Sequence, residues 1–315
     1  MTVPPGPDGP ADGAGARPAA HDTVPAPPLR VDLEVGGRPV RVRVWPAASP
    51  RDGDGPLLLA LHGWAESGET FGSLAGILRR RWTVLAPDAP AHGGTGWPAG
   101  RPYRLEEHAL GVRALVDCLP GRGSTRRIVL LGHAMGALTA ARVASMRRHD
   151  VVHLVLEEPS RTAARGHRSH EHLRTWLLSR QSEDLPRRLA RAAELYPTWS
   201  REDRLVWARS TAEVDPGHLA AAPDWGEPLA PLLTGVRCPV TIVHGRRDRG
   251  GIVSPAAARR CADACPEGGE VVVLAQAGHH PRREAGERFG ELLAGILRRH
   301  GRDREGEPGP AAGRP

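Results

Sequence analysis

Short apolar runs alternate with amphipathic segments through most of this chain, and no other feature constrains its fold as strongly. Short uninterrupted apolar runs are typical of strands buried on both faces, whereas longer segments with 3.6-residue periodicity are typical of helices. We predict strands at 31–35, 40–45, 57–61, 82–86, 128–131, 151–156, 240–243 and 271–274. We predict helices at 70–80, 105–118, 134–147, 255–264 and 283–298. This alternation predicts an α/β fold with a mostly parallel central sheet and helices on both faces.

The alternation is interrupted between residues 160 and 228, which are rich in Arg and Glu, helical in period and without a clear strand. We predict that this inserted segment forms a helical cap over the carboxyl ends of the strands, where open α/β sheets bind ligands. The core then comprises residues 30–159 and 229–300. Residues 1–29 and 301–315 have little to bury and are predicted to be disordered tails.

The composition excludes several classes of protein. All 43 basic residues are Arg, so chemistry that needs Lys, such as Schiff-base catalysis or a Walker-A phosphate loop, is excluded. The net charge is +7, but the Arg residues are interleaved with Asp and Glu, so we expect no nucleic-acid partner. The absence of Lys and Asn indicates a GC-rich genome. No run approaches the roughly 18 apolar residues of a membrane helix, and the first residues lack a signal-peptide pattern. We therefore expect a cytoplasmic protein without a membrane partner.

The cysteines predict no metal centre. Cys261 and Cys265 lie four residues apart on one face of a predicted helix. A metal site would need two further ligands at suitable spacing, and none accompanies them. We therefore predict small, reduced thiols that are buried or half-buried. No motif in the chain needs a metal or an organic cofactor, so we expect neither.

Short motifs follow the predicted strands at their carboxyl ends. In chain order they are His62-Gly63-Trp64, Asp88 to Gly93, Gly132-His133-Ala134-Met135-Gly136, Asp248 and Gly278-His279. The carboxyl ends of parallel strands share one edge of a sheet, which is where open α/β sheets bind ligands. The sequence therefore predicts that these motifs form a single site.

This series resembles the α/β-hydrolase superfamily from about residue 31 to residue 299. That family has a G-x-S-x-G nucleophile elbow, followed along the chain by an acid and then a histidine. The resemblance implies that His279 is the catalytic base and that Asp248 holds its tautomer. His280 is the neighbouring alternative, but the family pattern places the histidine directly after Gly278, which favours His279.

The resemblance also assigns roles to the residues around the elbow. It implies an oxyanion hole formed by the backbone amides of Trp64 and Met135. It makes Gly132, His133 and Gly136 structural residues of the elbow, because neighbouring backbone approaches the two glycines closely.

The chain departs from the family at the centre of the elbow, which is Ala134. A methyl group cannot attack a substrate, and removing the serine of a triad lowers the rate by about 10⁶-fold. Epoxide and haloalkane chemistry is also disfavoured, because those branches of the family use Asp at this position. The resemblance therefore implies the fold and most of the site, but not serine-hydrolase activity.

Three hypotheses remain open for such a site. In the first, His279 and Asp248 act as a general base on a small ester- or lactone-like substrate or biosynthetic intermediate, without a covalent intermediate. In the second, the capped pocket belongs to a non-catalytic small-molecule receptor or scaffold. In the third, the chain is a hydrolase disabled by loss of its serine. All three imply a small-molecule ligand, and none fixes the oligomeric state.

Two adjacent carboxylates end the predicted strand at 151–156. Glu157 and Glu158 are predicted to face the cap. We interpret them as solvated or cap-anchoring side chains, with a substrate-facing role as the alternative.

Overall fold

The strands of the computed structural model are β1 (Leu29–Glu34), β2 (Pro39–Trp45), β3 (Leu57–Leu61), β4 (Val84–Pro87), β5 (Ile128–His133), β6 (Val151–Glu157), β7 (Val240–His244) and β8 (Gly269–Val273). They form an eight-stranded sheet in the order β1-β2-β4-β3-β5-β6-β7-β8. β2 is antiparallel to both β1 and β4, and the other neighbours are parallel. The predicted mostly parallel α/β sheet is confirmed.

The structure describes residues 27–48, 56–98, 101, 103–119, 127–146, 150–162, 170–219 and 224–300. The predicted tail at 301–315 lies outside these ranges, as does most of the predicted tail at 1–29. Among the described residues, no helix has the length and apolar character needed to cross a bilayer.

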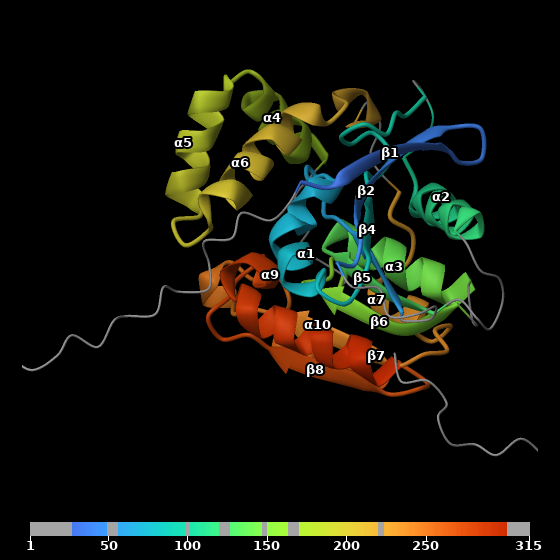
Figure 1. The fold of residues 1–315 in the computed structure, drawn as a ribbon. Helices are drawn as coiled ribbons and strands as arrows, with labels where there is room; N and C mark the ends of the chain where they lie inside the picture. The colour runs from blue at the N-terminus through green and yellow to red at the C-terminus, as the bar shows by residue number, and fades with distance from the viewer. Residues whose placement is uncertain are drawn as a thin grey trace, which may run out of the picture.

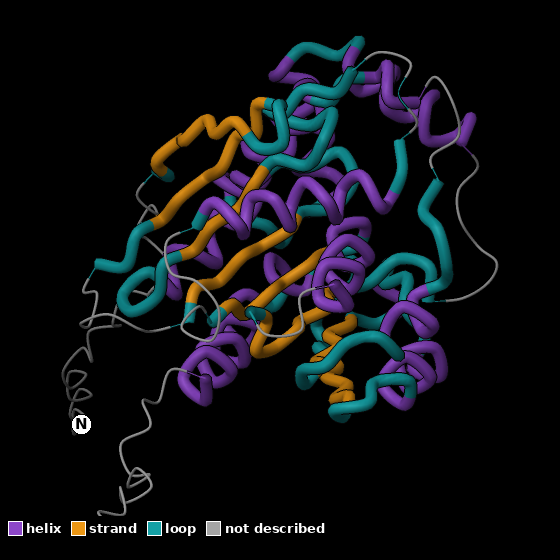
Figure 2. Tube along the Cα trace, turned by 90° about the vertical axis from the view of Figure 1, so that its right-hand side faces the viewer, coloured by secondary structure: helices purple, strands orange, loops and turns teal. Residues whose placement is uncertain are grey.

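The helices are α1 (Gly72–Leu78), α2 (Leu105–Cys118), α3 (Met135–Met146), α4 (His170–Gln181), α5 (Leu185–Leu195), α6 (Arg201–Ser210), α7 (Leu229–Leu233), α8 (Pro255–Asp263), α9 (Pro281–Glu284) and α10 (Gly286–His300). Helices α2, α3, α7 and α8 pack on one face of the sheet, and α1 and α10 pack on the other. Figure 2 shows helices on both sides of the strands. The predicted helix at 283–298 is divided between α9 and α10.

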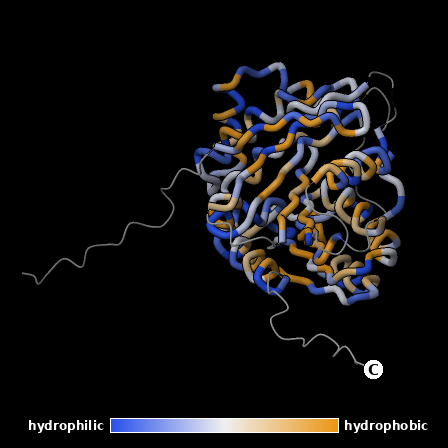
Figure 3. The backbone as a smooth tube through the Cα atoms, turned by 45° about the vertical axis from the view of Figure 1, so that its right-hand side comes forward, coloured by the Kyte–Doolittle hydropathy of each residue, from blue (hydrophilic) through white to orange (hydrophobic). Residues whose placement is uncertain are grey.

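Alternation along the buried strands produces the two halves of the core. In β3, Leu59 and Leu61 pack with α2 and α3, whereas Leu58 and Ala60 pack with α1 and α10. Hydrophobic segments accordingly gather in the central strands and hydrophilic ones at the periphery (Figure 3). Burial on both faces explains why these strands are continuous apolar runs in the sequence.

The register of the parallel strands brings their carboxyl ends to one level. Leu61 of β3 pairs with Gly132 of β5, and His133 of β5 pairs with Glu157 of β6. Glu157 in turn pairs with Val243 of β7. The residues directly after β3, β5, β6 and β7 therefore meet at the same edge of the sheet.

Helices α4, α5 and α6 come between β6 and β7 and form a separate group at the upper left of Figure 1. They contact the loop and helix after β3. The Ser210 hydroxyl lies 3.0 Å from that of Ser67, and the Ser73 hydroxyl donates to Asp203 at 2.9 Å. These helices occupy much of the segment predicted as a cap, and they touch the core next to the carboxyl ends of the strands.

Candidate active site

Residue 134 lies at the turn between β5 and α3. Ala134 adopts the left-handed conformation with φ of 48°, which is unfavourable for alanine by about 1–2 kcal/mol. Its amide donates to the Glu157 carbonyl at 3.0 Å, and its carbonyl accepts from the Ala137 amide at 3.2 Å. The chain therefore maintains a strained backbone at a position whose methyl group has no chemistry of its own.

The two elbow glycines are required by close approach of backbone. A Cβ atom on Gly132 would lie 2.3 Å from the carbonyl oxygen of Gly136, and one on Gly136 would lie 2.2 Å from that of Leu61. The first turn of α3 thus rests directly on the end of β3. This contact brings the elbow against the turn that contains Trp64.

The predicted oxyanion donors, Trp64 and Met135, lie on these two adjoining turns. Met135 is the first residue of α3, so its amide has no acceptor within the helix. Both side chains belong to one apolar cluster, together with Trp97 and Tyr103. Within the described part of the chain, neither backbone amide is paired with a protein acceptor. The two amides are therefore available to a ligand.

His279 is half-buried, with 29% of its side chain exposed, and it faces a carboxylate. Its Nδ1 lies 3.4 Å from Oε2 of Glu158, which directly follows β6 and has no exposed side-chain surface. Glu158 also accepts hydrogen bonds from the backbone amides of Gly245 at 2.9 Å and Ile252 at 2.6 Å. A buried carboxylate held by two amides is oriented to fix the imidazole tautomer.

The predicted pairing of Asp248 with His279 is corrected by this geometry. Asp248 lies on the surface with 60% of its side chain exposed, and its carboxylate is bound to the guanidinium of Arg246. That hydrogen bond lowers the pKa of Asp248 below its ordinary value. The prediction failed because Asp248 is in a short helical turn beyond the end of β7, while the residue after β6 reaches the imidazole.

A second buried carboxylate connects the turn after β3 with the elbow. Glu66 accepts from the Gly63 amide at 3.1 Å, and its Oε2 lies 3.2 Å from Nδ1 of His133. Nε2 of His133 lies 2.9 Å from the backbone oxygen of His279. Glu66 and His133 therefore link the candidate oxyanion turn to the loop that carries the candidate base.

Two arginines compensate the charge of Glu66. Arg282, only 1% exposed, contacts Glu66 at 2.9 Å and Glu157 at 2.9 Å, and Arg283 lies 3.1 Å from Glu66. Burial alone would raise the pKa of Glu66, but these guanidinium groups outweigh burial and hold the pKa well below its ordinary value. Glu66 is therefore a permanent anion in a buried network.

The same region contains three groups that could each offer a metal ligand. One atom each of Glu66, His133 and His280 lies within 4.8 Å of the others. The carboxylate is already in contact with the guanidiniums of Arg282 and Arg283, which supply the positive charge that a metal ion would bring. Glu66 is therefore part of an ion-pair network with Arg282 and Arg283, whose positive charge disfavours a metal cation at this cluster.

The two closely spaced cysteines have no ligand geometry either. The Cys265 thiol donates to the backbone oxygen of Cys261 at 3.3 Å. Burial raises the pKa of both thiols to about 11. They behave as small buried side chains of α8 and the turn that follows it.

Comparison with known proteins agrees with the fold. A model described as the alpha/beta hydrolase family matches residues 57–292. The chain belongs to the alpha/beta hydrolase family. The matched region begins at β3 and ends within α10, so it includes every motif at the carboxyl edge of the sheet.

Family members with stated activities show moderate similarity to this chain. It is 26% identical over 249 residues to the pimeloyl-[acyl-carrier protein] methyl ester esterase of Nitrosomonas europaea, covering 75% of this chain and 94% of that protein. N-formylmaleamic acid deformylase from Pseudomonas putida S16 superposes with a TM-score of 0.69 at 20% identity, covering 84% of this chain and all of that one. E-2-(acetamidomethylene)succinate hydrolase superposes with a TM-score of 0.65 at 22% identity, covering 86% and 99%. These structures share the fold.

Proposed function

We propose that this alpha/beta hydrolase family protein acts on small ester- or lactone-like molecules through the Glu158–His279 pair, without a covalent intermediate. The observation that carries the proposal is an acid–imidazole pair held in place by backbone amides beside an elbow whose central residue, Ala134, has no nucleophile. Glu158 takes the role that sequence analysis had given to Asp248.

The chemistry follows from the tautomer of His279. Nδ1–H donates to Glu158, so Nε2 is free to accept a proton from water. The resulting hydroxide adds to the substrate carbonyl, and the amides of Trp64 and Met135 stabilise the oxyanion. Collapse of the intermediate breaks the bond to the leaving group, which takes the proton from His279. Water is added across the cleaved bond, and Ala134 takes no part.

Helices α4 to α6 are proposed to be the cap over this site. Trp176 of α4 packs on Trp64, with ring centroids 5.3 Å apart. Trp199, just before α6, packs on His280, with ring centroids 4.8 Å apart. These contacts support a cap that excludes bulk water beside both the oxyanion turn and the loop of His279.

The names of the relatives support the substrate class. One is named as a methyl ester esterase, and a further solved structure, at 22% identity and a TM-score of 0.63, is an enol-lactonase from Burkholderia xenovorans. Hydrolysis of an ester or a lactone requires attack on a carbonyl carbon, which is the chemistry proposed here.

A paired assay tests the proposal. The chain and its His279→Ala, Glu158→Gln and Ala134→Ser variants are given a panel of activated short- and medium-chain esters and lactones, together with a serine-reactive phosphonate. We expect the unmodified chain to turn over at least one substrate without phosphonate labelling, and both His279→Ala and Glu158→Gln to abolish that turnover. If the unmodified chain shows no turnover while the Ala134→Ser variant is active and is labelled by the phosphonate, the chain is instead a disabled hydrolase.

The second candidate is a small-molecule receptor, and the observation that favours it is Ala134 itself. If neither the chain nor the Ala134→Ser variant reacts, the general-base proposal fails. Ligand binding that is unchanged in His279→Gln would then support a receptor that uses the same fold.

A further inference from the structure

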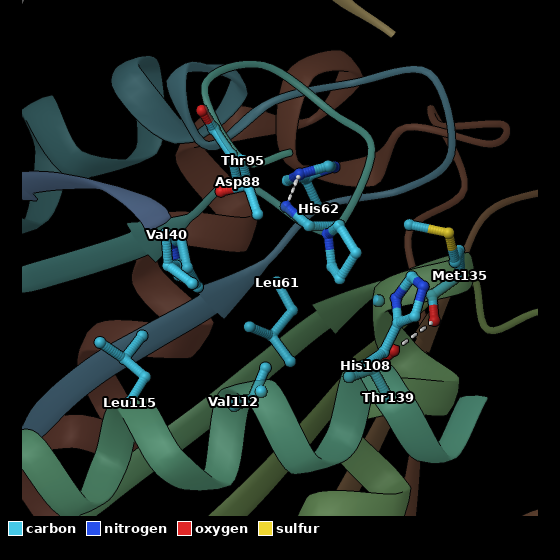
Figure 4. Close-up of a pocket in the computed structure, with 15 residues that line it drawn as sticks. Val40, Leu61, His62, Asp88, Thr95, His108, Val112, Leu115, Met135 and Thr139 are labelled. Carbon is cyan, nitrogen blue, oxygen red and sulfur yellow. Dashed lines mark hydrogen bonds between the residues drawn. The ribbon is translucent and has the colours of Figure 1, made fainter. Parts of the chain in front are cut away.

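A cavity of about 50 Å³ lies on the other side of the elbow from His279. Its walls come from β2, β3, the loop after β4, and the facing sides of α2 and α3 (Figure 4). The Glu158–His279 pair lies toward β6 and β7, whereas this cavity lies toward β4 and β2, and neither member of the pair lines it. The cavity therefore lies away from the Glu158–His279 pair, although it adjoins the candidate active site at Met135 and Gly136 of the elbow helix.

The lining is mostly apolar. Val40, Leu61, Val112 and Leu115 supply aliphatic surface, and Figure 4 shows them around the middle of the cavity. Aliphatic walls favour a ligand with a hydrocarbon body, because its apolar surface leaves water on binding. A volume of about 50 Å³ is about one third of the 150 Å³ cavity known to take benzene, so it suits a molecule of only a few heavy atoms.

One polar atom in the wall has no partner among the described residues. His108 of α2 is only 2% exposed, and its Nε2 makes no hydrogen bond to any of them. Its ring is held edge-on against Tyr103, with ring centroids 4.4 Å apart, so its orientation is fixed. A buried polar atom without a partner in a cavity wall is strongly favoured to bind a ligand group or a water.

The other polar groups of the wall are occupied or negative. The Asp88 carboxylate accepts from the backbone amides of Gly68 and Gly94, both at 2.8 Å, and from Arg43 at 3.2 Å. Nε2 of His62 accepts from the Ala89 amide at 2.8 Å. A carboxylate in the wall and the absence of a guanidinium among the lining residues disfavour an anionic ligand.

We infer that this cavity binds a small aliphatic alcohol, with its hydroxyl group on Nε2 of His108 and its hydrocarbon chain between α2 and β3. A hydroxyl group both donates and accepts, so it satisfies Nε2 in either tautomer of the neutral imidazole. The inference rests on the cavity alone and is independent of any reaction at His279.

Titration of the isotopically labelled chain with 1-propanol, followed by amide chemical shifts, tests the inference. We expect saturable shifts concentrated at Val112, Met135, Gly136 and Thr139. Propionate, which matches 1-propanol in size but carries a charge, should bind at least about tenfold more weakly. Chemical shifts that grow linearly with the 1-propanol concentration and are spread over the surface would overturn the inference. Water would then be the partner of His108 Nε2.

Two variants and a matched control locate the ligand. Gly111 lines the cavity and has no atom within 4 Å of an added Cβ, so Gly111→Leu fills space without a backbone clash and should abolish saturable binding. Gly295 in α10 is outside the cavity wall, and an added Cβ there would meet only the end of the Arg298 side chain, at 3.9 Å, so Gly295→Leu should bind 1-propanol like the parent chain. His108→Leu keeps the apolar wall and should weaken binding about 3- to 10-fold, the contribution of one hydrogen bond. Unchanged affinity in both Gly111→Leu and His108→Leu would refute the assignment, and propionate binding as tight as that of 1-propanol would exclude a neutral alcohol.

Discussion

The backbone amide of Gly245 donates a 2.9 Å hydrogen bond to the carboxylate of Glu158. A Cβ atom on Gly245 would lie 2.2 Å from the backbone oxygen of Gly278, so the end of β7 also touches the loop that carries His279. Gly245 thus contacts both Glu158, the residue after β6, and the loop that carries His279. Main-chain packing, rather than an exposed ion pair, sets the distance between Glu158 and His279.

Glu158 rather than Asp248 should govern nucleophilic reactivity once a serine is present. In the Ala134→Ser background, we expect Glu158→Gln to slow phosphonate labelling by about 10³-fold or more, because the amide cannot stabilise the imidazolium. Asp248→Asn should stay within about threefold of its parent, because the exposed pair with Arg246 contributes little. The labelling rates of the three proteins are the measurement. A large loss in Asp248→Asn with none in Glu158→Gln would reverse the assignment.

Substituting the two helical glycines should have opposite effects on stability. A Cβ on Gly136 would lie 2.2 Å from the Leu61 oxygen, so Gly136→Ala should lower the free energy of unfolding by about 3 kcal/mol or more. Gly111 of α2 has open space around its Cβ position, so Gly111→Ala should raise it by up to about 1 kcal/mol. Urea denaturation of both variants provides the comparison. Equal effects would show that the close approach of α3 to β3 is absent in solution.

Removing Arg282 should strongly destabilise the protein. Its guanidinium bridges Glu66 and Glu157 at 2.9 Å each. Arg282→Leu would leave the charge of Glu157 uncompensated and would leave Glu66 with Arg283 as its remaining guanidinium partner. We expect a loss of about 3–5 kcal/mol in the free energy of unfolding at neutral pH. Arg246→Leu, which breaks an exposed pair, should lose less than about 1 kcal/mol. A similar small loss in both variants would contradict a structural role for the buried network.

His108 in the cavity wall should make the stability of the protein fall in mild acid. Burial, with His62 and His218 nearby, lowers the pKa of His108 from 6.5 to about 3. Between pH 6.5 and pH 3, His108 is protonated in the unfolded chain but neutral in the folded chain. This histidine therefore lowers the free energy of unfolding as pH falls below 6.5. At pH 5 the effect is about 2 kcal/mol.

The His108→Leu variant isolates this contribution. Between pH 7.5 and pH 5 its free energy of unfolding should decline by about 2 kcal/mol less than that of the parent chain. Denaturant titrations at the two pH values measure the difference. The remaining decline comes from other buried histidines, including His92 and His280, whose pKa values burial also lowers. Parallel pH profiles for the two proteins would contradict a buried neutral His108.

The sequence predicts the sheet and the elbow because both have strong local signals. β3 and β5 are buried on both faces, so they appear as continuous apolar runs. Gly132 and Gly136 both belong to one strand–turn–helix unit, so their spacing is visible in the sequence, although the contact that requires Gly136 is with Leu61 of β3. Boundaries were less accurate: the predicted helix at 70–80 begins as a short 3₁₀ turn and becomes α1 only at Gly72.

The acid partner of His279 could not be predicted in the same way, because it depends on contacts between distant segments. Asp248 and Glu158 both follow parallel strands near the site, and the order of motifs favoured Asp248. A signal for Glu158 was present in the two adjacent carboxylates at the end of a strand buried on both faces, where a charged side chain requires a partner. In the structure Glu157 meets Arg282, and Glu158 meets His279.

The left-handed turn at residue 134 is maintained by main-chain hydrogen bonds and by the two glycines, and none of these contacts involves the methyl group of Ala134. Serine, cysteine and aspartate could therefore be installed one at a time in an unchanged backbone. Such a series would form a calibrated set in which only the attacking atom differs. The protein would then serve as a reference for intrinsic nucleophile strength within a single preorganised environment.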